Sequence, residues 1–362
     1  MLIKFFDTLS IQDLPSVGGK NASLGEMTRS LSKYGIRIPE GFAITAEAYR
    51  LFLKENRLTE KLSASLKKLD PTHLENLAEV GFSCRQIMSS GNMPEVLKKE
   101  IIEAYHKLIK EKETSVAVRS SATAEDLPSA SFAGQHESFL NISGEENLLN
   151  AVHRCYVSLF NDRAIKYRLD NGFDHMQVAL SVGVQRMVRS DMAGAGVAFT
   201  LDPETGFRNV VYLTSAWGLG ENVVQGAVNP DEFYLFKPSL ASGKKSIINK
   251  KAGSKENKMI YAAEGSRPIV NVCTTPAERN TFSISDEEAE ILGKWCLAVE
   301  NHYGMPMDIE WAKDGLTGEL FIVQARSETV HGKNEKITIK EFELKSKSTP
   351  LCTGKAVGHA IA

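Results

Sequence analysis

The chain has 362 residues, of which 42% are hydrophobic and 24% charged, a globular composition that excludes a disordered or low-complexity protein. Its 43 Lys and Arg against 45 Asp and Glu give a net charge of −2, which argues against a protein built to coat nucleic acid or an anionic membrane. No apolar run approaches the ~20 residues of a membrane span. The five cysteines show no CxxC spacing, so we expect a cytoplasmic protein with reduced thiols.

The first 110 residues are predicted to be mostly helical. The first helix is expected to end at Gly35. A short strand is predicted at 38–44, with Thr45 as the N-cap of the next helix. Further helix continues to about residue 110, with an interruption near 89–94. The apolar residues that set the period of the first helix are Leu24, Met27 and Leu31.

From Ser115 onward strands dominate the pattern. The first runs from Val116 into Arg119, and residues 120–135 (SSATAEDLPSASFAGQ) have too many small residues to be core. Ser285 and Glu288 have the spacing of a capping box at the start of a helix. Helices are predicted at 145–160 and 286–303, strands at 177–188, 196–201, 210–215 and 232–236, and a hairpin that pairs 307–312 with 320–326.

The mixture of helices and strands indicates an α+β protein with two lobes, at 1–190 and 191–332. Residues 333–347 are charged and weakly periodic, which indicates a linker. Residues 348–362 resume a strand-like pattern that stops, so we expect the truncated start of a further domain.

The sequence lacks GxxxxGK[ST], GxGxxG, HExxH and GxSxG, so other residues must carry any phosphate chemistry. The segment VGGKN at 17–21 opens the first predicted helix. Two glycines would let the backbone approach a ligand closely, the helix N-terminus offers free N–H groups, and Lys20 adds a charge. The alternative is an ordinary glycine turn before a surface helix.

Arg119 is predicted to lie where a strand enters a loop of small residues. Its guanidinium could bind phosphate, or it could form an ion pair with Glu125 or Asp126. The segment 129–135 (SASFAGQ) suits a flap whose N–H groups point at phosphate oxygens, although a plain surface loop fits the same residues.

The closing hairpin is the most informative segment. Asp308 and Glu310 share one face of their strand, and Gln324 and Arg326 share one face of theirs. We expect the register to bring Glu310 towards Gln324, with Phe321, Val323 and Ala325 on the other face. Oxygen ligands of this kind suit Mg²⁺, which shares its shell with water and phosphate. The alternative is an exposed face of ordinary ion pairs.

Two further features are weaker. The lysines between Lys244 and Lys258 are interrupted by Glu256 and are interpreted as a solvated loop, in which Lys255 could lie nearer the site. His359 has no partner histidine nearby, and we assign it no catalytic role.

Together these segments resemble the phosphoenolpyruvate synthase (pyruvate, water dikinase) family over about residues 10–331. In that family a proline follows the last arginine, where this chain has Ser327. The matching stretches are VGGKNASLGEM at 17–27, VAVRSSATAEDLPSASFAGQ at 116–135, GFDHMQVALSVGVQRMVRSD at 172–191, WGLGENVVQGAVNPDEFY at 217–234, and HYGMPMDIEWAKDG with LFIVQARSETV within 302–330.

The resemblance implies a two-lobed, ATP-grasp type nucleotide-binding domain with ATP and Mg²⁺ as cofactors. In the family, a phosphohistidine domain and a pyruvate-binding barrel follow, and both are expected beyond this chain. The family reaction converts ATP, pyruvate and water to AMP, phosphoenolpyruvate and phosphate through the phosphohistidine. The open alternatives are an antibiotic-modifying dikinase of the rifampin phosphotransferase kind and a non-catalytic nucleotide-binding module. Neither a nucleic acid nor a membrane is an expected partner.

The resemblance also implies residue roles. Lys20, Arg119 and Arg326 would hold the triphosphate during catalysis. Glu310 and Gln324 would position the metal, with Asp308 supporting it directly or through another ligand. The phosphate flap would comprise Ser131, Ala133, Gly134 and Gln135, and the hinge that binds adenine would comprise Gln185, Met187 and Val188.

Overall fold

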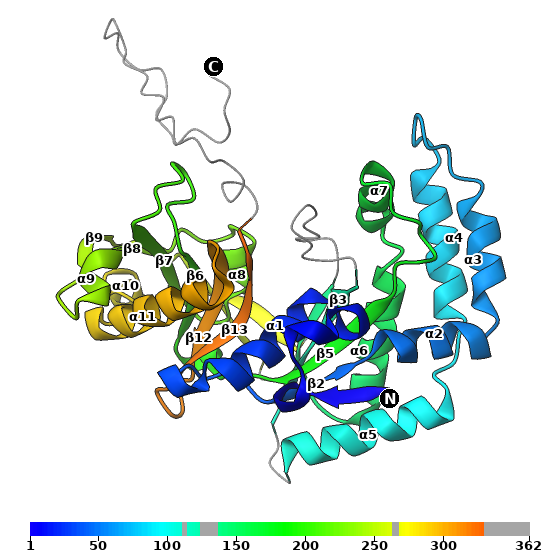
Figure 1. Ribbon diagram of the computed structural model, residues 1–362, viewed down its shortest axis with the longest axis horizontal. Coiled ribbons are helices and arrows are strands. Elements are labelled where there is room, and N and C mark those ends of the chain that lie inside the picture. Colours follow the sequence, from blue (N-terminus) through cyan, green and yellow to red (C-terminus); the bar gives the residue numbers. More distant parts are fainter. Residues whose placement is uncertain (111–113, 124–136, 263–267, 329–362) are drawn as a thin grey trace, which may run out of the picture.

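The computed structural model describes residues 1–110, 114–123, 137–262 and 268–328, which form two β-sheets with helices packed around them (Figure 1). Helix α1 (Leu14–Ser30), drawn in blue near the centre of the view, lies between the two sheets (Figure 1). None of the helices within these ranges has the length and apolar character needed to cross a bilayer.

The first sheet has the strand order β1-β2-β5-β3-β4, and every neighbouring pair is antiparallel. Its strands are β1 (Ile3–Phe5), β2 (Gly41–Ile44), β3 (Val116–Ala122), β4 (Ser138–Ile142) and β5 (Leu180–Arg186). The helices of this part are α2 (Ala46–Glu55), α3 (Leu58–Leu66), α4 (Leu77–Ser89), α5 (Glu95–Ile109), α6 (Glu145–Ser158) and α7 (Asp162–Asp170).

One apolar core joins these helices to the first sheet. The predicted helix at 145–160 is confirmed as α6, and its stripe of Leu148, Val152 and Tyr156 is buried. Thr45 does precede α2, but its hydroxyl donates to the Met1 carbonyl at 3.1 Å and makes no cap to the helix. Helix α7 was not predicted, because only three of its nine residues are buried and its apolar pattern is short.

The second sheet has the order β13-β12-β6-β7-β8-β9, also antiparallel throughout. The predicted closing hairpin is confirmed as β12 and β13. The strands are β6 (Gly194–Phe199), β7 (Val210–Trp217), β8 (Asp231–Phe236), β9 (Ile247–Lys251), β12 (Met307–Lys313) and β13 (Leu320–Ser327). A separate pair, β10 (Asn257–Tyr261) with β11 (Ile269–Cys273), and short helices α8 (Glu221–Val224), α9 (Lys237–Ala241) and α10 (Pro276–Arg279) accompany it.

Helix α11 (Asp286–Tyr303) covers the core face of the second sheet. The predicted capping box is confirmed: Glu288 N–H donates to Ser285 Oγ at 3.2 Å, and Ser285 N–H donates to Glu288 Oε2 at 3.0 Å. The helix ends at Gly304, whose φ of 68° is left-handed.

Helix α1 is buried on nearly all sides, which excludes the surface helix considered above. Its apolar residues Leu24 and Met27 pack into the core of the second sheet. The backbone breaks at Gly18 (φ 73°), where a Cβ atom would lie 2.3 Å from Ser121 Oγ. This glycine therefore permits a close approach to strand β3, and not the close approach to a ligand that the sequence suggested.

Two other expectations about loops are wrong. Ser120 and Ser121 continue β3 and are only 1% exposed, because small side chains are needed where α1 crosses the strand. The lysine-rich segment contains β9 and the start of β10, and Lys255 is fully buried in an ion pair with Asp231. Local composition predicted solvent-exposed loops at both places, whereas contacts with distant parts of the chain bury Ser120, Ser121 and Lys255.

Candidate functional site

A cavity of about 910 Å³ lies between the two sheets. Its walls come from α1, from β3, β4 and β5 of the first sheet, and from β6, β12 and β13 of the second. The predicted site residues that line it are Lys20, Arg119, Gln185, Met187, Val188, Glu310, Gln324 and Arg326. The predicted flap (Ser131, Ala133, Gly134, Gln135) and the alternative partners Glu125 and Asp126 lie outside the described residues.

The closing hairpin has the predicted register at Glu310 and Gln324. Glu310 lies opposite Gln324, and Asp308 lies opposite Arg326. Beyond Glu310 the register shifts, because Trp311 pairs with Ile322 and leaves Val323 as an extra residue on β13.

This bulge corrects one expectation. Phe321 and Val323 were placed on the face opposite to Gln324, but both pack with Val188 and Ala312 on the cavity side. Only Ala325 of the expected three lies in the core behind the sheet.

Arg119 reaches across the cavity from β3 to β12. Its Nη1 lies 3.7 Å from Glu310 Oε2, and its buried Nε has no hydrogen-bond partner among the described residues. A buried donor without a partner is costly unless something binds it. Arg119 therefore carries unused hydrogen-bonding capacity into the cavity.

Lys20 enters the cavity from the first turn after the break at Gly18. Its Nζ donates to the Ser120 carbonyl at 3.4 Å, a long contact for an ammonium group. Helix α1 thus places a cation beside Ser120 of β3, the residue that follows Arg119.

A second orphan donor lines the same cavity at its apolar end. The Gln185 side chain is 4% exposed, and within the part of the chain that the structure describes its Nε2 has no hydrogen-bond partner. Beyond it, the Met187 N–H donates to the Ser115 carbonyl at 3.0 Å, and the Val188 carbonyl accepts from the Ser190 N–H at 2.7 Å.

Two small apolar clusters flank this end of the cavity. Met187 belongs to one and Val188 to the other, so consecutive residues contribute to different clusters. The two clusters make this end of the cavity apolar, which suits the faces of a flat ring. The first cluster contains Ala117, Leu140 and Leu219, and the second contains Ala195, Ala312 and Val323.

The charges around the cavity favour an anion. Among the described lining residues, cationic side chains outnumber carboxylates, and such an excess in a concave site concentrates polyanions. The cations are Lys20, Arg119, Arg154, Arg163, Arg186 and Arg326, and the carboxylates are Glu137, Glu221 and Glu310.

Several lining residues were missed by the sequence reasoning. Arg154 lies 3.8 Å from Glu137 and 4.2 Å over the Phe139 ring, and Arg163 comes from the unpredicted α7. Leu219 to Glu221 also line the cavity, and the glycines that bracket Leu219 are a signal that could have pointed to them.

Asp308 does not line the cavity. Its buried carboxylate accepts from Arg326 Nε at 2.7 Å and from Nη2 at 2.5 Å. Burial raises the pKa of Asp308 above its ordinary value, against the opposing pull of Arg326 and with help from Glu310.

The residues that remain for a metal are oxygen donors. Within the described part of the chain, no group of three or more His, Cys, Asp or Glu side chains could hold a metal by itself. Glu310 and Gln324 face each other at the cavity wall, which fits Mg²⁺, since that ion commonly takes one or two protein oxygens and completes its shell with phosphate and water.

Comparison with known proteins gives matches along nearly the whole chain. Residues 14–346 match the family described as the AMP/ATP-binding domain of pyruvate phosphate dikinase. The chain is 53% identical to the phosphoenolpyruvate synthase of Neisseria meningitidis serogroup B, over 99% of this chain and 46% of that protein. It is 50% identical to the Escherichia coli K12 phosphoenolpyruvate synthase, again over 99% of this chain and 46% of the relative.

A more distant match extends to the archaea. The probable phosphoenolpyruvate synthase of Methanocaldococcus jannaschii is 42% identical over 95% of this chain and 28% of its own length. The chain thus spans a little under half the length of the two bacterial relatives. Since the family match covers most of its residues, the chain belongs to the pyruvate phosphate dikinase AMP/ATP-binding domain family.

Proposed function

We propose that this chain is the ATP-binding, phosphoryl-donor part of a phosphoenolpyruvate synthase, with an ATP-grasp type fold. The observation that carries the proposal is a cavity that Arg119 of one sheet lines together with Glu310 and Arg326 of the other, with Arg119 paired to Glu310. Fixed cations and oxygen donors in one concave site suit a nucleoside triphosphate with its metal ion.

The phosphate end is assigned to Lys20, Arg119 and Arg326. Each side chain lines the cavity and carries a positive charge. Arginine matches phosphate oxygens through paired N–H groups, and Arg119 Nε, which has no hydrogen-bond partner among the described residues, would gain an acceptor on binding. Ser131, Ala133, Gly134 and Gln135 are proposed to cover the phosphates as a flap.

The base end is assigned to Gln185, Met187 and Val188. Two of the backbone groups here are already engaged, so adenine would use the Met187 carbonyl as acceptor for its amine and the Val188 N–H as donor to its ring. The orphan Gln185 Nε2 would donate to a ring nitrogen. The two apolar clusters would contact the faces of the ring.

Mg²⁺ would be held by Glu310 and Gln324 together with phosphate oxygens. When bound, it would neutralise charge on the phosphates during transfer. The protein's own contribution is alignment: the cations hold the phosphates in one orientation, and the apolar walls exclude water from the base. In the proposed reaction the β- and γ-phosphates of ATP pass to a histidine outside this chain, leaving AMP.

The domain organisation is part of the same proposal. Residues 1–190 and 191–332 would form the two lobes, with a linker at 333–347 and the start of a swivelling phosphohistidine domain at 348–362. These last two segments lie outside the described residues. The sheets themselves fall on either side of residue 190, while α1 packs into the core of the second.

Calorimetric titration with ATP and GTP, each with and without Mg²⁺, tests the site. We expect ATP to bind more tightly, because guanine would present an acceptor to the Met187 carbonyl and leave it unpaired. Affinity for ATP should rise with Mg²⁺. Equal affinities for the two nucleotides, unaffected by Mg²⁺, would contradict the assignment of the base and metal positions.

The donor role is tested with a chimera in which this chain replaces the matched part of the Neisseria relative. With ATP and pyruvate the chimera should release AMP and form phosphoenolpyruvate. Release of ADP, or nucleotide binding without turnover, would contradict the proposed role. The chain alone should bind ATP and form no phosphoenolpyruvate.

A further inference from the structure

Helix α1 is hydrogen-bonded to both sheets within one turn of Lys20. Asn21 Nδ2 donates to Ser181 Oγ of β5 at 3.0 Å, and Ser23 Oγ donates to the Ala325 carbonyl of β13 at 2.9 Å. Asn21 is 2% exposed and Ser23 is 7% exposed. Buried polar contacts of this kind fix elements relative to each other, because breaking one leaves an unpaired group in the interior.

The contact with β5 is closely fitted. Asn21 Nδ2 also donates to the Val17 carbonyl at 3.0 Å, and the Ser181 hydroxyl donates a hydrogen bond to the Ile44 carbonyl at 2.7 Å. A Cβ atom on Gly183 would lie 2.3 Å from Asn21 Oδ1, so only glycine leaves room for this amide. Asn21 is therefore held against β5 two residues from Gln185.

The contact with β13 falls between two cavity residues. Ala325, whose carbonyl Ser23 engages, lies between Gln324 and Arg326. The Tyr303 hydroxyl of α11 lies 3.2 Å from Ser23 Oγ, and burial raises the pKa of Tyr303 to about 12, so it remains a neutral donor or acceptor. One turn further along α1, Glu26 Oε1 lies 2.9 Å from Nε2 of His302 on α11.

The two contacts lie on opposite sides of the same helix. Lys20 precedes Asn21 directly and lines the cavity that both sheets enclose. The spacing between β5, Lys20 and β13 therefore depends on one rigid element, since consecutive helical residues keep a fixed rise of ~1.5 Å each. Figure 1 shows α1 between the strands of the two sheets.

We infer that Asn21 and Ser23 are positioning residues, Asn21 for the base end of the cavity and Ser23 for its phosphate end. The inference rests on the proposed ATP site. Ser23 holds the backbone between Gln324 and Arg326 level with Lys20, so that Arg326 and Lys20 reach the same phosphates and Gln324 reaches the metal that they share. Asn21 holds α1 against the strand that carries Gln185, at the base end of the cavity.

The two residues should have different effects on nucleotide selectivity. AMP has the base and one phosphate, whereas ATP also needs the groups that Ser23 aligns. Ser23→Ala should therefore weaken ATP–Mg²⁺ binding about five- to tenfold, the value of one hydrogen bond, and leave AMP binding within about twofold of the unaltered chain. Asn21→Ala should weaken both nucleotides to a similar extent.

The experiment is a calorimetric titration of the chain with ATP–Mg²⁺ and with AMP, with thermal unfolding recorded for each variant. Thr28→Ala is the matched control, because Thr28 Oγ1 donates to the Leu24 carbonyl of the same helix at 2.8 Å and, among the described residues, to neither sheet. A lower melting temperature alone would follow from any structural role. The ratio of the ATP to the AMP dissociation constant should change in Ser23→Ala and in neither other variant.

The outcomes separate the two proposals. If the unaltered chain binds both nucleotides and Ser23→Ala weakens both equally, or neither, the positioning role is wrong and the proposed site stands. If the unaltered chain binds no nucleotide, both are wrong. Tyr303→Phe leaves the Ser23 contact to Ala325 in place, so its ratio should remain near that of the unaltered chain. A ratio shifted as far as that of Ser23→Ala would overturn the role assigned to Ser23.

Discussion

Arg326 donates two hydrogen bonds to the same oxygen of Asp308, from Nε at 2.7 Å and from Nη2 at 2.5 Å. The two residues are partners on neighbouring strands, so the guanidinium is held by the strand that also carries Glu310. Asp308 lies beneath the cavity wall and is not among the lining residues. We therefore propose that it acts on a nucleotide through Arg326 rather than as a metal ligand.

Asp308→Asn should weaken ATP binding about tenfold, because a neutral amide holds Arg326 less firmly than a carboxylate does. The Mg²⁺ concentration that gives half-maximal ATP binding should not change. Nucleotide titrations at several Mg²⁺ concentrations measure both quantities. A large change in the Mg²⁺ requirement would instead support a direct metal role.

Glu310→Gln should raise the Mg²⁺ concentration needed for ATP binding, since it replaces the one carboxylate in the proposed donor pair. Affinity for ATP without Mg²⁺ should change little or improve, because a negative charge beside the phosphates is lost. The same titrations applied to Asp308→Asn provide the comparison. An unchanged Mg²⁺ dependence would remove Glu310 from the metal site.

Arg119→Ala should lower ATP affinity at least tenfold and leave thermal stability almost unchanged. The side chain brings a positive charge to the cavity, and among the described residues its buried Nε makes no hydrogen bond that folding would lose. Arg154→Ala, at the rim of the same cavity, should have a smaller effect, because Glu137 already pairs with it. Equal losses of stability and binding in Arg119→Ala would mark it as structural.

His175 should make the protein sensitive to acid. Burial, with a smaller contribution from Arg168, lowers the pKa of His175 to about 4. A base with a lowered pKa in the folded state stabilises the fold above its unfolded pKa of ~6.5, and this contribution is lost as the pH falls towards the folded value. We expect the free energy of unfolding to drop by about 2 kcal/mol over that window, less than the full shift would give, because the imidazole is only partly buried and solvent screens its charge.

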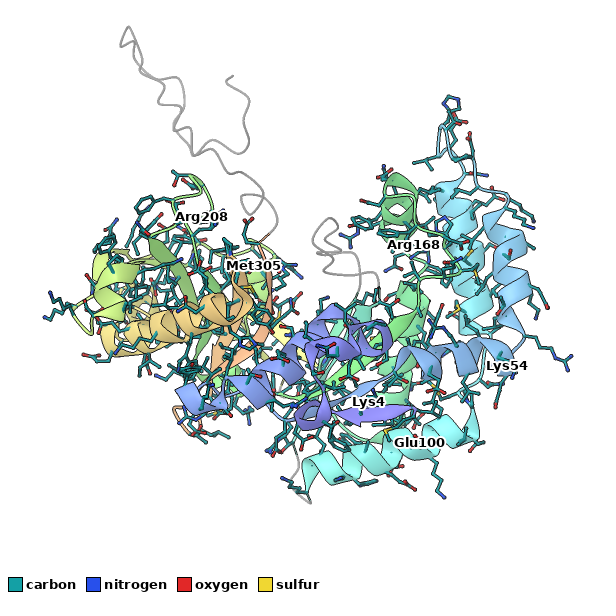
Figure 2. The ribbon with its side chains drawn as sticks, viewed as in Figure 1. Lys4, Lys54, Glu100, Arg168, Arg208 and Met305 are labelled. Carbon is teal, nitrogen blue, oxygen red and sulfur yellow. The ribbon has the colours of Figure 1, made fainter. Side chains whose placement is uncertain are left out.

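Urea unfolding at a series of pH values measures this slope. His175→Gln should flatten it, because a glutamine oxygen can still accept from Arg168 Nε, now 2.9 Å from His175 Nδ1, without titrating. Arg168 itself is labelled in Figure 2, at α7. His73→Gln, on the exposed surface, is the control. Parallel slopes in His175→Gln and the unaltered chain would show that another group is responsible.

Lys255→Met should cost about 3–5 kcal/mol of stability, because it leaves Asp231 charged and buried without its cation. The two side chains are fully buried, and Asp231 also accepts from the Ser283 N–H at 2.8 Å. Denaturant unfolding should show the loss, while nucleotide affinity stays the same since Lys255 does not line the cavity. Lys251→Met, on the exposed side of β9, should change stability by less than about 0.5 kcal/mol.

The parts of the site that could be predicted are those governed by local pattern. Alternation along β12 separates Glu310 from Trp311, and Ser285 with Glu288 fixes the start of α11. Both signals lie within a few residues. The position of the hairpin register at Glu310 and Gln324 followed from the same alternation.

The parts that failed depend on contacts distant in sequence. Nothing near Lys255 indicates that Asp231, on another strand, neutralises it in the interior. Likewise Ser121 is buried only because Gly18 of α1 crosses it, more than a hundred residues earlier in the chain. A run of small polar or charged residues looks solvated until such a partner is known.

The bulge at Val323 has a consequence for the kind of molecule that the cavity can accept. In a regular strand, successive side chains on one face are ~6.8 Å apart. An apolar and a polar side chain on the cavity face would therefore be separated by two residues. Here Val323 and Gln324 are immediate neighbours and both line the cavity. A ligand in which a flat apolar ring is joined to a charged group by a short linker can therefore contact both side chains at once. A nucleotide has this shape, whereas a free sugar or an inorganic anion does not.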